Sequence, residues 1–267
     1  MRNLLSSTLP LWAALLLIAA IAVPGLFAKA RTFRPPDGGN SGLSNSLQML
    51  VVTTGSWDGV QGTAQRYERF SLKGKWHAVG PGFPVVVGKT GLGWGRGIQP
   101  ENAGPADGPV KHEGDGKAPA GIFVLPTSFG YSPDPLPGAR MPYTALSPGV
   151  ECVDDSASSH YNQLLNAEGM TKDWSSSEQM RRSDELYRWG VFVAHNSNPP
   201  QSGAGSCIFL HIWRGPDQGT VGCTAMQQAN IESLLLWLDP GKHPVLVQLP
   251  DPEYARYRKA WSLPRHP

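Results

Sequence analysis

Two residues in the C-terminal third of the chain have the types and the spacing for nucleophilic chemistry. His211 lies near the end of an apolar run, and Cys223 follows 12 positions later (223 − 211), directly after Gly222. An imidazole close to a thiol can take its proton, which gives a thiolate–imidazolium pair and an activated sulfur nucleophile. The pair therefore predicts cysteine-based acyl transfer. The alternative is a buried structural cysteine near a core histidine.

Two predicted elements position this pair. The run Cys207–Trp213 predicts a strand that delivers His211, and Thr224–Leu238 predicts a helix whose apolar face ends at Asp239-Pro240-Gly241. Cys223 would then stand at a helix N-terminus, where backbone N–H groups and the helix dipole favour a thiolate. The N–H groups of Gly222, Cys223 and Thr224 are candidates for an oxyanion hole, and Gly222 leaves room for a substrate carbonyl.

The rest of the chain predicts a mostly β fold with a few helices. Gly (31) and Pro (25) are abundant, which is typical of short strands joined by turns. Helical material is expected between Ser156 and Arg188, where Ser175 and Glu178 form a capping-box pattern. Gly88–Gly121 is expected to be a long loop. The other predicted strands are Gln48–Thr53, Thr63–Ser71, Lys75–Val79, Phe83–Val87, Ile122–Leu125, Tyr143–Leu146, Trp189–His195 and Pro244–Leu249.

The N-terminus resembles an export signal. Met1 and Arg2 give a positive start, Leu9–Val23 is apolar, and Ala28-Lys29-Ala30 offers small residues for cleavage after Ala30. The alternative is a retained membrane anchor, although the apolar run of about 15 residues is short of the roughly 20 that span a bilayer. Either reading places the protein outside the cytoplasm, in the periplasm or cell envelope.

Four segments follow from these patterns. Residues 1–30 are the predicted signal peptide or anchor, 31–46 a linker, 47–250 the folded domain and 251–267 a C-terminal tail. Hydrophobic residues make up 40% of the chain and charged residues 16%, which suits a globular core. The net charge of +2 comes from scattered basic residues, so we expect no nucleic-acid partner. We expect a monomer, with membrane contact only through an uncleaved N-terminal segment.

An odd number of cysteines in an exported chain leaves one free if a disulfide forms. Cys152 and Cys207 are the natural pair, because Cys223 has a use as a thiol. A second cluster runs from Cys152 through Asp154 and Asp155 to His160 and Asn162. It could orient His211 through a carboxylate, or it could be structural.

Other candidate groups are less specific. His195 and Asn196 end a predicted strand and could line a substrate cleft, or they could be structural. Trp94 and Trp213 could stack on sugar rings, although tryptophan is more often a core residue. No close ligand pair such as Cys-x-x-Cys is present, so we expect neither a catalytic metal nor another cofactor.

Two segments resemble one enzyme family. Thr220-Val221-Gly222-Cys223, with His211 upstream, resembles the Ser/Thr-x-Gly-Cys signature of the L,D-transpeptidase (YkuD-like) catalytic domain. Glu113–Phe123 is similar to the Gly-Asp-Gly-Lys-Thr-Pro-x-Gly-x-Phe segment of the same family. The resemblance covers Leu47–Leu249 and implies a β-sandwich catalytic fold. Within the family, the group that orients the histidine is often a backbone carbonyl.

The chain departs from the family pattern in places. Val221 stands where many members have His, Thr224-Ala225-Met226 replaces an early Arg or Asn, and the loop after His211 is short. The chain therefore resembles a divergent branch. Thr220 and Trp213 join His195 and Asn196 as candidate substrate-binding residues.

The resemblance implies chemistry on peptidoglycan stem peptides. Cys223 would attack a stem-peptide carbonyl, and His211 would take the thiol proton and later protonate the leaving amine. An amine of a second stem would resolve the acyl-cysteine and form a cross-link. If water resolves it, the enzyme is a carboxypeptidase or cross-link-cleaving peptidase. A third reading is a non-catalytic wall-binding module.

Overall fold

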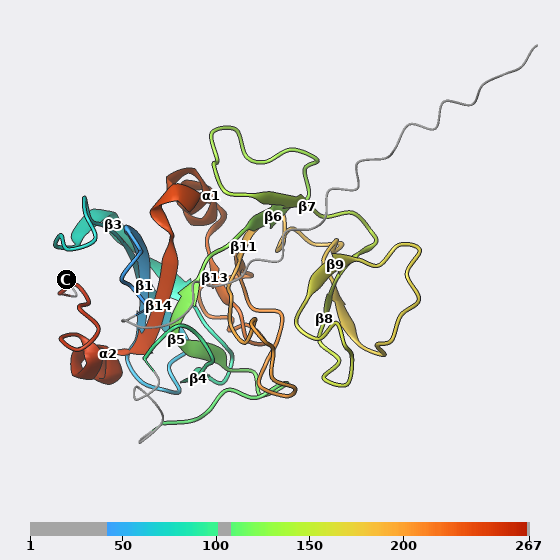
Figure 1. Cartoon of the computed structure of the whole chain (residues 1–267), viewed down its shortest axis with the longest axis horizontal. Coiled ribbons are helices and arrows are strands. Elements are labelled where there is room, and N and C mark those ends of the chain that lie inside the picture. Colours follow the sequence, from blue (N-terminus) through green and yellow to red (C-terminus); the bar gives the residue numbers. More distant parts are fainter. Residues whose placement is uncertain (1–41, 101–107, 266–267) are drawn as a thin grey trace, which may run out of the picture. The chain divides into compact units, whose positions relative to one another are not determined.

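The computed structural model describes residues 42–100 and 108–265, and these are mostly β-structure (Figure 1). Across these ranges, 14 strands form two sheets of 11 and 3 strands, accompanied by two α-helices. The predicted fold class, mostly β with a few helices, is confirmed. The predicted signal segment 1–30 and residues 31–41 of the predicted linker lie outside the described residues. Among residues 42–100 and 108–265, no helix is long and apolar enough to cross a bilayer.

The larger sheet has the strand order β4-β5-β14-β1-β2-β3-β13-β12-β11-β6-β7, and the smaller has the order β10-β8-β9. The strands of the larger sheet are β1 (Gln48–Thr54), β2 (Gln61–Glu68), β3 (His77–Val86), β4 (Leu92–Trp94), β5 (Ala118–Val124), β6 (Ser128–Gly130), β7 (Tyr143–Ala145), β11 (Trp189–Phe192), β12 (Phe209–Ile212), β13 (Thr224–Met226) and β14 (Val245–Pro250). Those of the smaller are β8 (Val150–Val153), β9 (Leu164–Asn166) and β10 (Ser177–Gln179).

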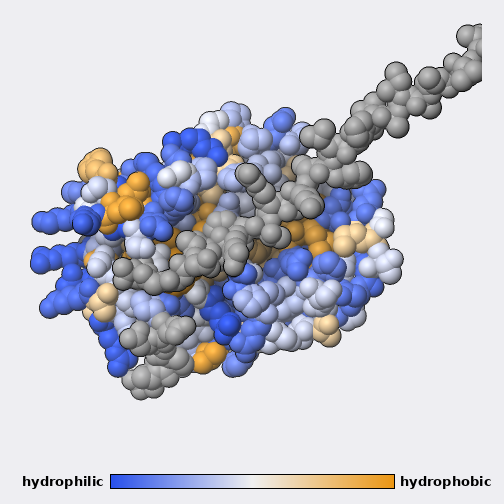
Figure 2. Space-filling view, viewed as in Figure 1, coloured by the Kyte–Doolittle hydropathy of each residue, from blue (hydrophilic) through white to orange (hydrophobic). Residues whose placement is uncertain are grey.

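One core joins the two halves of the larger sheet. All seven residues of β1 are buried, as expected for a strand with a parallel neighbour, here β14, on one side and β2 on the other. Val51 of β1, Phe123 of β5, Val191 of β11 and Leu210 of β12 belong to one buried cluster. Side chains from both halves of the sheet therefore pack together. On the face shown in Figure 2, hydrophilic side chains predominate.

The helix predicted over Thr224–Leu238 begins later than expected. Helix α1 spans Gln228–Trp237, with Ile231, Leu234 and Leu235 buried as the apolar period predicts. Residues 224–226 instead form β13, which pairs with β12 and β3. Sheet pairing on both sides outweighs the helical preference of these three residues. Cys223 is therefore not at a helix N-terminus, and that prediction is wrong.

The helical material predicted between Ser156 and Arg188 is also wrong, because this segment contains the strands β9 and β10 and no helix. The capping-box pattern is misleading: Ser175 donates its hydroxyl to Asp155, and Glu178 lies in β10, paired antiparallel with β8. Ser175 and Glu178 therefore bond to residues far away in the sequence and do not cap a helix.

Several predicted segment boundaries differ from those in the structure. The two predicted strands Lys75–Val79 and Phe83–Val87 are one strand, β3, with a register shift opposite Ala64 and Arg66 of β2. The predicted loop Gly88–Gly121 contains β4 and the first residues of β5. The segment predicted as a tail contains helix α2 (Asp251–Tyr257). Leu43, in the predicted linker, and Trp261, in the predicted tail, are both buried in the core.

Candidate active site

The pairing of β12 with β13 places Cys223 and His211 on the same face of the sheet. In this parallel pair, Leu210 lies opposite Thr224 and His211 opposite Ala225. Cys223 directly precedes β13 and therefore lies beside Phe209. Since alternate residues of a strand point to one face, Phe209 and His211 share the face on which Cys223 lies. The loop between the two strands returns the chain to the start of β12 and closes the pair.

Cys223 is held as a buried thiol. The Phe209 N–H donates to Cys223 Sγ at 3.3 Å, and the thiol donates to the Cys207 carbonyl at 3.6 Å. The residue is only 5% exposed. Burial, with a further contribution from the charge of Glu178, raises the pKa of the thiol well above its usual value. The sulfur is therefore protonated at neutral pH in this conformation.

His211 is oriented by a backbone carbonyl. Its Nδ1 lies 2.7 Å from the Ile212 carbonyl oxygen, which can only accept a hydrogen bond, so Nδ1 carries the proton and Nε2 keeps a lone pair. Burial lowers the pKa of His211 to about 4, so the imidazole is neutral at pH 7. The orienting group matches the family expectation. The alternative, a carboxylate from the Cys152–Asn162 cluster, is not what the geometry shows.

The expected thiolate–imidazolium pair is therefore not the resting state. The structure instead pairs a neutral thiol with a neutral imidazole. Two physical causes explain the difference: both side chains are buried, which penalises charge, and β13 replaces the helix whose N-terminus was to stabilise the thiolate. Ionisation has to accompany substrate binding or a movement that exposes the sulfur.

The turn before Cys223 is fixed by Thr220. The Thr220 hydroxyl donates to the Cys223 carbonyl at 2.6 Å and accepts the Gly222 N–H at 3.1 Å. The Gly222 N–H is thus already used. Among the described residues, no backbone acceptor is found for the Cys223 N–H. Of the three predicted oxyanion donors, Cys223 N–H is the one that the local hydrogen bonding favours.

The upstream motif at Glu113–Phe123 reaches the same turn. A Cβ added at Gly222 would lie 3.3 Å from the Lys117 carbonyl oxygen, so the two segments are in close contact. Buried Gln248 of β14 forms a second link, because it accepts from the Thr224 hydroxyl at 2.7 Å and donates to the Pro119 carbonyl at 2.9 Å. Two motifs that are a hundred residues apart therefore build one site.

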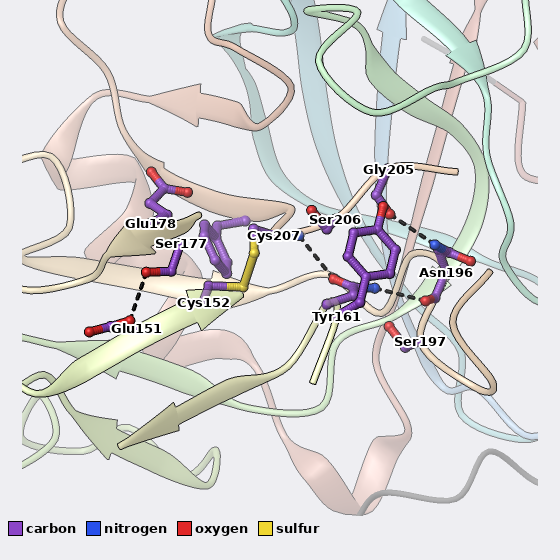
Figure 3. Close-up of a disulfide and its surroundings, with 12 residues drawn as sticks. Glu151, Cys152, Tyr161, Ser177, Glu178, Asn196, Ser197, Gly205, Ser206 and Cys207 are labelled. Atoms are coloured by element: carbon purple, nitrogen blue, oxygen red, sulfur yellow. Dashed lines mark hydrogen bonds between the residues drawn. A yellow bond between two sulfur atoms is a disulfide. The ribbon is translucent and has the colours of Figure 1, made fainter. Parts of the chain in front are cut away.

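A disulfide ties the smaller sheet to this site (Figure 3). Cys152 of β8 is bonded to Cys207, with a Cα–Cα distance of 5.9 Å, and Cys223 is the free cysteine. This is the pairing expected from the sequence. Cys152, Cys207 and Cys223 lie in one buried cluster, so the smaller sheet contributes to the cover over the thiol.

Two residues near the thiol were missed in the sequence. Tyr187 is buried, its ring lies 5.1 Å from the His211 ring, and its hydroxyl donates to Glu178 Oε1 at 2.5 Å. Tyr187 belongs to the same buried cluster as Cys223. The only sequence signal was the pattern around Glu178, which suggested a helix cap.

His195 and Asn196 are structural in this conformation. Both are buried, and His195 Nδ1 accepts the Arg96 N–H while Nε2 lies 2.9 Å from the Ala204 carbonyl. Asn196 donates to the carbonyls of Gln201 and Gly205. These bonds hold the loop before Cys207 and leave neither side chain open to a substrate.

Of the remaining candidate residues, Asn162 and Trp94 have structural roles, and Trp213 is partly exposed to solvent. Asn162 donates to the carbonyls of His195 and Asn196 and accepts the Cys207 N–H, so it also fixes the disulfide loop. Trp94 is buried in the core, whereas Trp213 is partly exposed at the end of β12. Within the described ranges, no group of three or more His, Cys, Asp or Glu side chains is arranged to hold a metal ion.

Comparison with known proteins agrees with this geometry. The family model of the L,D-transpeptidase catalytic domain (YkuD) matches residues 72–247, which is more than half of the chain. Comparisons with curated proteins and with solved structures give no significant match. The matched range contains β3 to β13, His211, Cys223 and both motifs. The chain therefore belongs to the L,D-transpeptidase catalytic domain (YkuD) family.

Proposed function

We propose that this protein is a cysteine acyl-transferase that cross-links or remodels peptidoglycan by L,D-transpeptidation of stem peptides. The observation that carries the proposal is the placement of Cys223 and His211 on one face of the paired strands β12 and β13, with the Nδ1 of His211 fixed on the Ile212 carbonyl. This leaves Nε2 as a base in a domain of the matching family.

In this reaction His211 acts as the base and acid, and Cys223 acts as the nucleophile. His211 Nε2 takes the thiol proton, and Cys223 Sγ attacks a carbonyl carbon of the donor stem. The Cys223 N–H donates to the oxyanion of the tetrahedral intermediate. His211 then protonates the leaving amine, and acyl-Cys223 remains. An amine of the acceptor stem attacks this thioester, which forms the new amide and returns the thiol.

The surface beside the nucleophile is the proposed substrate path. Val221 is 72% exposed although Cys223, two residues on, is buried, so the turn faces solvent on its outer side. Partly exposed Trp213, which directly follows β12, is a proposed substrate contact, and Thr220 acts indirectly by fixing the turn. His195 and Asn196 support the neighbouring loop.

We also propose that the protein acts in the periplasm or cell envelope. The export pattern in residues 1–30 supports this location, and so does the disulfide, because such bonds persist in oxidising compartments. Peptidoglycan stems are accessible there.

The test is incubation of the full exported chain with purified muropeptides, followed by mass spectrometry of the products. Joined stems support the transpeptidase. Loss of one residue from a stem identifies a carboxypeptidase, and separation of dimers identifies a cross-link-cleaving hydrolase. Absence of all three products, combined with muropeptide binding that survives Cys223→Ala, overturns the enzyme proposal in favour of a wall-binding module.

A further inference from the structure

A tyrosine–glutamate pair lies against Cys223, and the acyl-transfer steps above do not use it. Tyr187 packs its ring 5.6 Å from the Phe209 ring and 5.1 Å from the His211 ring. The backbone N–H of Phe209 donates to Cys223 Sγ, so Tyr187 packs against the residue whose backbone holds the thiol. Its hydroxyl donates to Glu178, and Tyr187 and Cys223 belong to one buried cluster.

The carboxyl of this pair comes from the smaller sheet. Glu178 of β10 lies directly opposite Cys152 of β8, so their side chains share one face. Cys152 is bonded to Cys207, and the Cys207 carbonyl accepts the thiol hydrogen of Cys223. The disulfide thus clamps Glu178 beside the nucleophile; Figure 3 shows Glu178 next to the disulfide.

The charged groups around the pair come from several elements. Glu178, Lys111 and Tyr187 act electrostatically on Cys223, and the Tyr187 ring also contacts the His211 ring. Tyr187, Arg182 and Asp154 act on Glu178, with Arg182 Nη1 3.8 Å from its carboxyl. Burial raises the pKa of Glu178.

A tyrosine hydroxyl has one proton to donate, and this limits what the pair can do. An ionised Glu178 accepts that proton and places a negative charge near the sulfur, which opposes thiolate formation. A protonated Glu178 donates to the Tyr187 oxygen instead, and the Tyr187 proton then points to the sulfur and stabilises a thiolate.

We propose that Tyr187 and Glu178 are positioning residues that control the ionisation of Cys223: ionised Glu178 keeps the thiol protonated, and protonation of Glu178 turns the Tyr187 hydroxyl toward the thiolate. No proton leaves Tyr187. The thiol proton goes to His211 Nε2, and the Glu178 proton comes from solvent. The functional meaning rests on the proposed role of Cys223 as nucleophile.

The experiment measures the rate at which iodoacetamide alkylates Cys223 in the full chain with its disulfide intact. Glu178→Gln removes the charge and donates an amide hydrogen to Tyr187, so alkylation at pH 7.5 should become roughly tenfold faster, the effect of one pKa unit. Adding Tyr187→Phe should reverse most of that gain. If Glu178→Gln acted only by loosening the packing, the double variant would alkylate at Cys223 at least as fast as Glu178→Gln alone.

Two matched controls separate charge from packing. Glu178→Asp keeps the charge and should stay within about twofold of the wild type, because the electrostatic penalty persists. The second control is the Tyr161–Glu113 pair, whose hydroxyl and carboxyl also lie 2.5 Å apart but which contacts Ser206. Glu113→Gln, alone or with Tyr161→Phe, should leave the alkylation rate nearly unchanged.

The proposal is overturned if the Glu178→Gln and double variants react equally fast, if Glu178→Asp is as fast as Glu178→Gln, or if the Glu113 controls give the same gain. If Glu178→Gln does not fold, Glu178→Met tests the same expectation, because it also removes the charge and frees the Tyr187 proton. Alkylation requires no muropeptide, so a failure of the proposed transpeptidase activity would show separately, as absent products with these rate differences intact.

Discussion

The sulfur of Cys223 lies 3.6 Å from the carbonyl oxygen of Cys207, and Cys207 is itself disulfide-bonded to Cys152. The residue that holds the free thiol is therefore also the residue that anchors the smaller sheet. The smaller sheet, which lies over the thiol, is therefore linked to the nucleophile. A shift of this sheet is transmitted through the disulfide to the backbone that contacts the Cys223 thiol.

Removal of the disulfide should affect both stability and thiol access. The bond joins residues 55 positions apart, so Cys152→Ser/Cys207→Ser should lower the free energy of unfolding by about 3–4 kcal/mol, measured by urea denaturation. The same variant should alkylate faster at Cys223, because the cover is no longer clamped. Dithiothreitol should speed the wild type and leave the double variant unchanged. Equal alkylation rates with and without the bond would show that the cover does not depend on it.

His211→Gln should abolish the base while keeping a polar side chain. Turnover of tetrapeptide stems should fall about 10²–10⁴-fold, the usual contribution of general acid–base catalysis. His195→Gln is the contrasting variant. It should lower the unfolding free energy because His195 bridges Arg96 and Ala204, while the folded fraction keeps its turnover. A His211→Gln enzyme with wild-type turnover would remove His211 from the mechanism.

The two buried histidines predict a pH-dependent stability. The pKa of His195 is lowered to about 3 and that of His211 to about 4, against 6.5 in the unfolded chain. The unfolded state therefore binds protons first as the pH falls, so the stabilising contribution is full above pH 6.5 and is lost as the pH falls toward 4 and 3. These pKa differences correspond to roughly 5 kcal/mol for His195 and roughly 3 kcal/mol for His211 at pH 7.

Urea denaturation at pH 7.5, 6.5, 5.5 and 4.5 checks this expectation. Lowered carboxyl pKa values, such as that of Glu151 at about 2, act in the same direction but only below pH 4.5. The raised pKa of Glu178 acts in the opposite sense. The slope between pH 6.5 and 4.5 should flatten in His211→Gln. A wild-type unfolding free energy that is constant across this window contradicts the assignment.

Gly222→Ala should disturb the turn that carries the nucleophile. Its Cβ would lie 3.3 Å from both the Lys117 carbonyl oxygen and the Ile208 side chain, at a backbone φ of +153°. We expect a stability loss of about 1–2 kcal/mol and at least a roughly tenfold fall in stem-peptide turnover, because the sulfur moves. Gly215→Ala in the same loop meets nothing within 4 Å and should behave as the wild type.

The sequence predicted most strands of the larger sheet and singled out Cys223 and His211 as candidates, but it did not predict the smaller sheet or the buried environment of these two residues. Cys223 and His211 were singled out because their residue types and spacing are informative by themselves, and strand β1 was predicted because Gln48–Thr53 is an apolar, β-prone run. The start of α1 was missed because Thr224–Met226 have partners in β12 and β3, which lie far away or across a loop in the sequence.

The ionisation state was mispredicted for a related reason. Burial of Cys223 comes from the disulfide cluster and the smaller sheet, and no local pattern around position 223 reports it. Tyr187 and Glu178 were likewise invisible, because their importance depends on a cross-strand pairing with Cys152. Long-range packing, rather than local propensity, decides these features.

Mass spectrometry of the intact protein during turnover of tetrapeptide stems tests whether Cys223 carries the acyl group. We expect a covalent adduct with the mass of the acyl donor on the peptide that contains Cys223, and we expect both this adduct and all product formation to be absent in Cys223→Ala. Product formation that continues in Cys223→Ala, or an adduct located on another residue, would contradict this expectation.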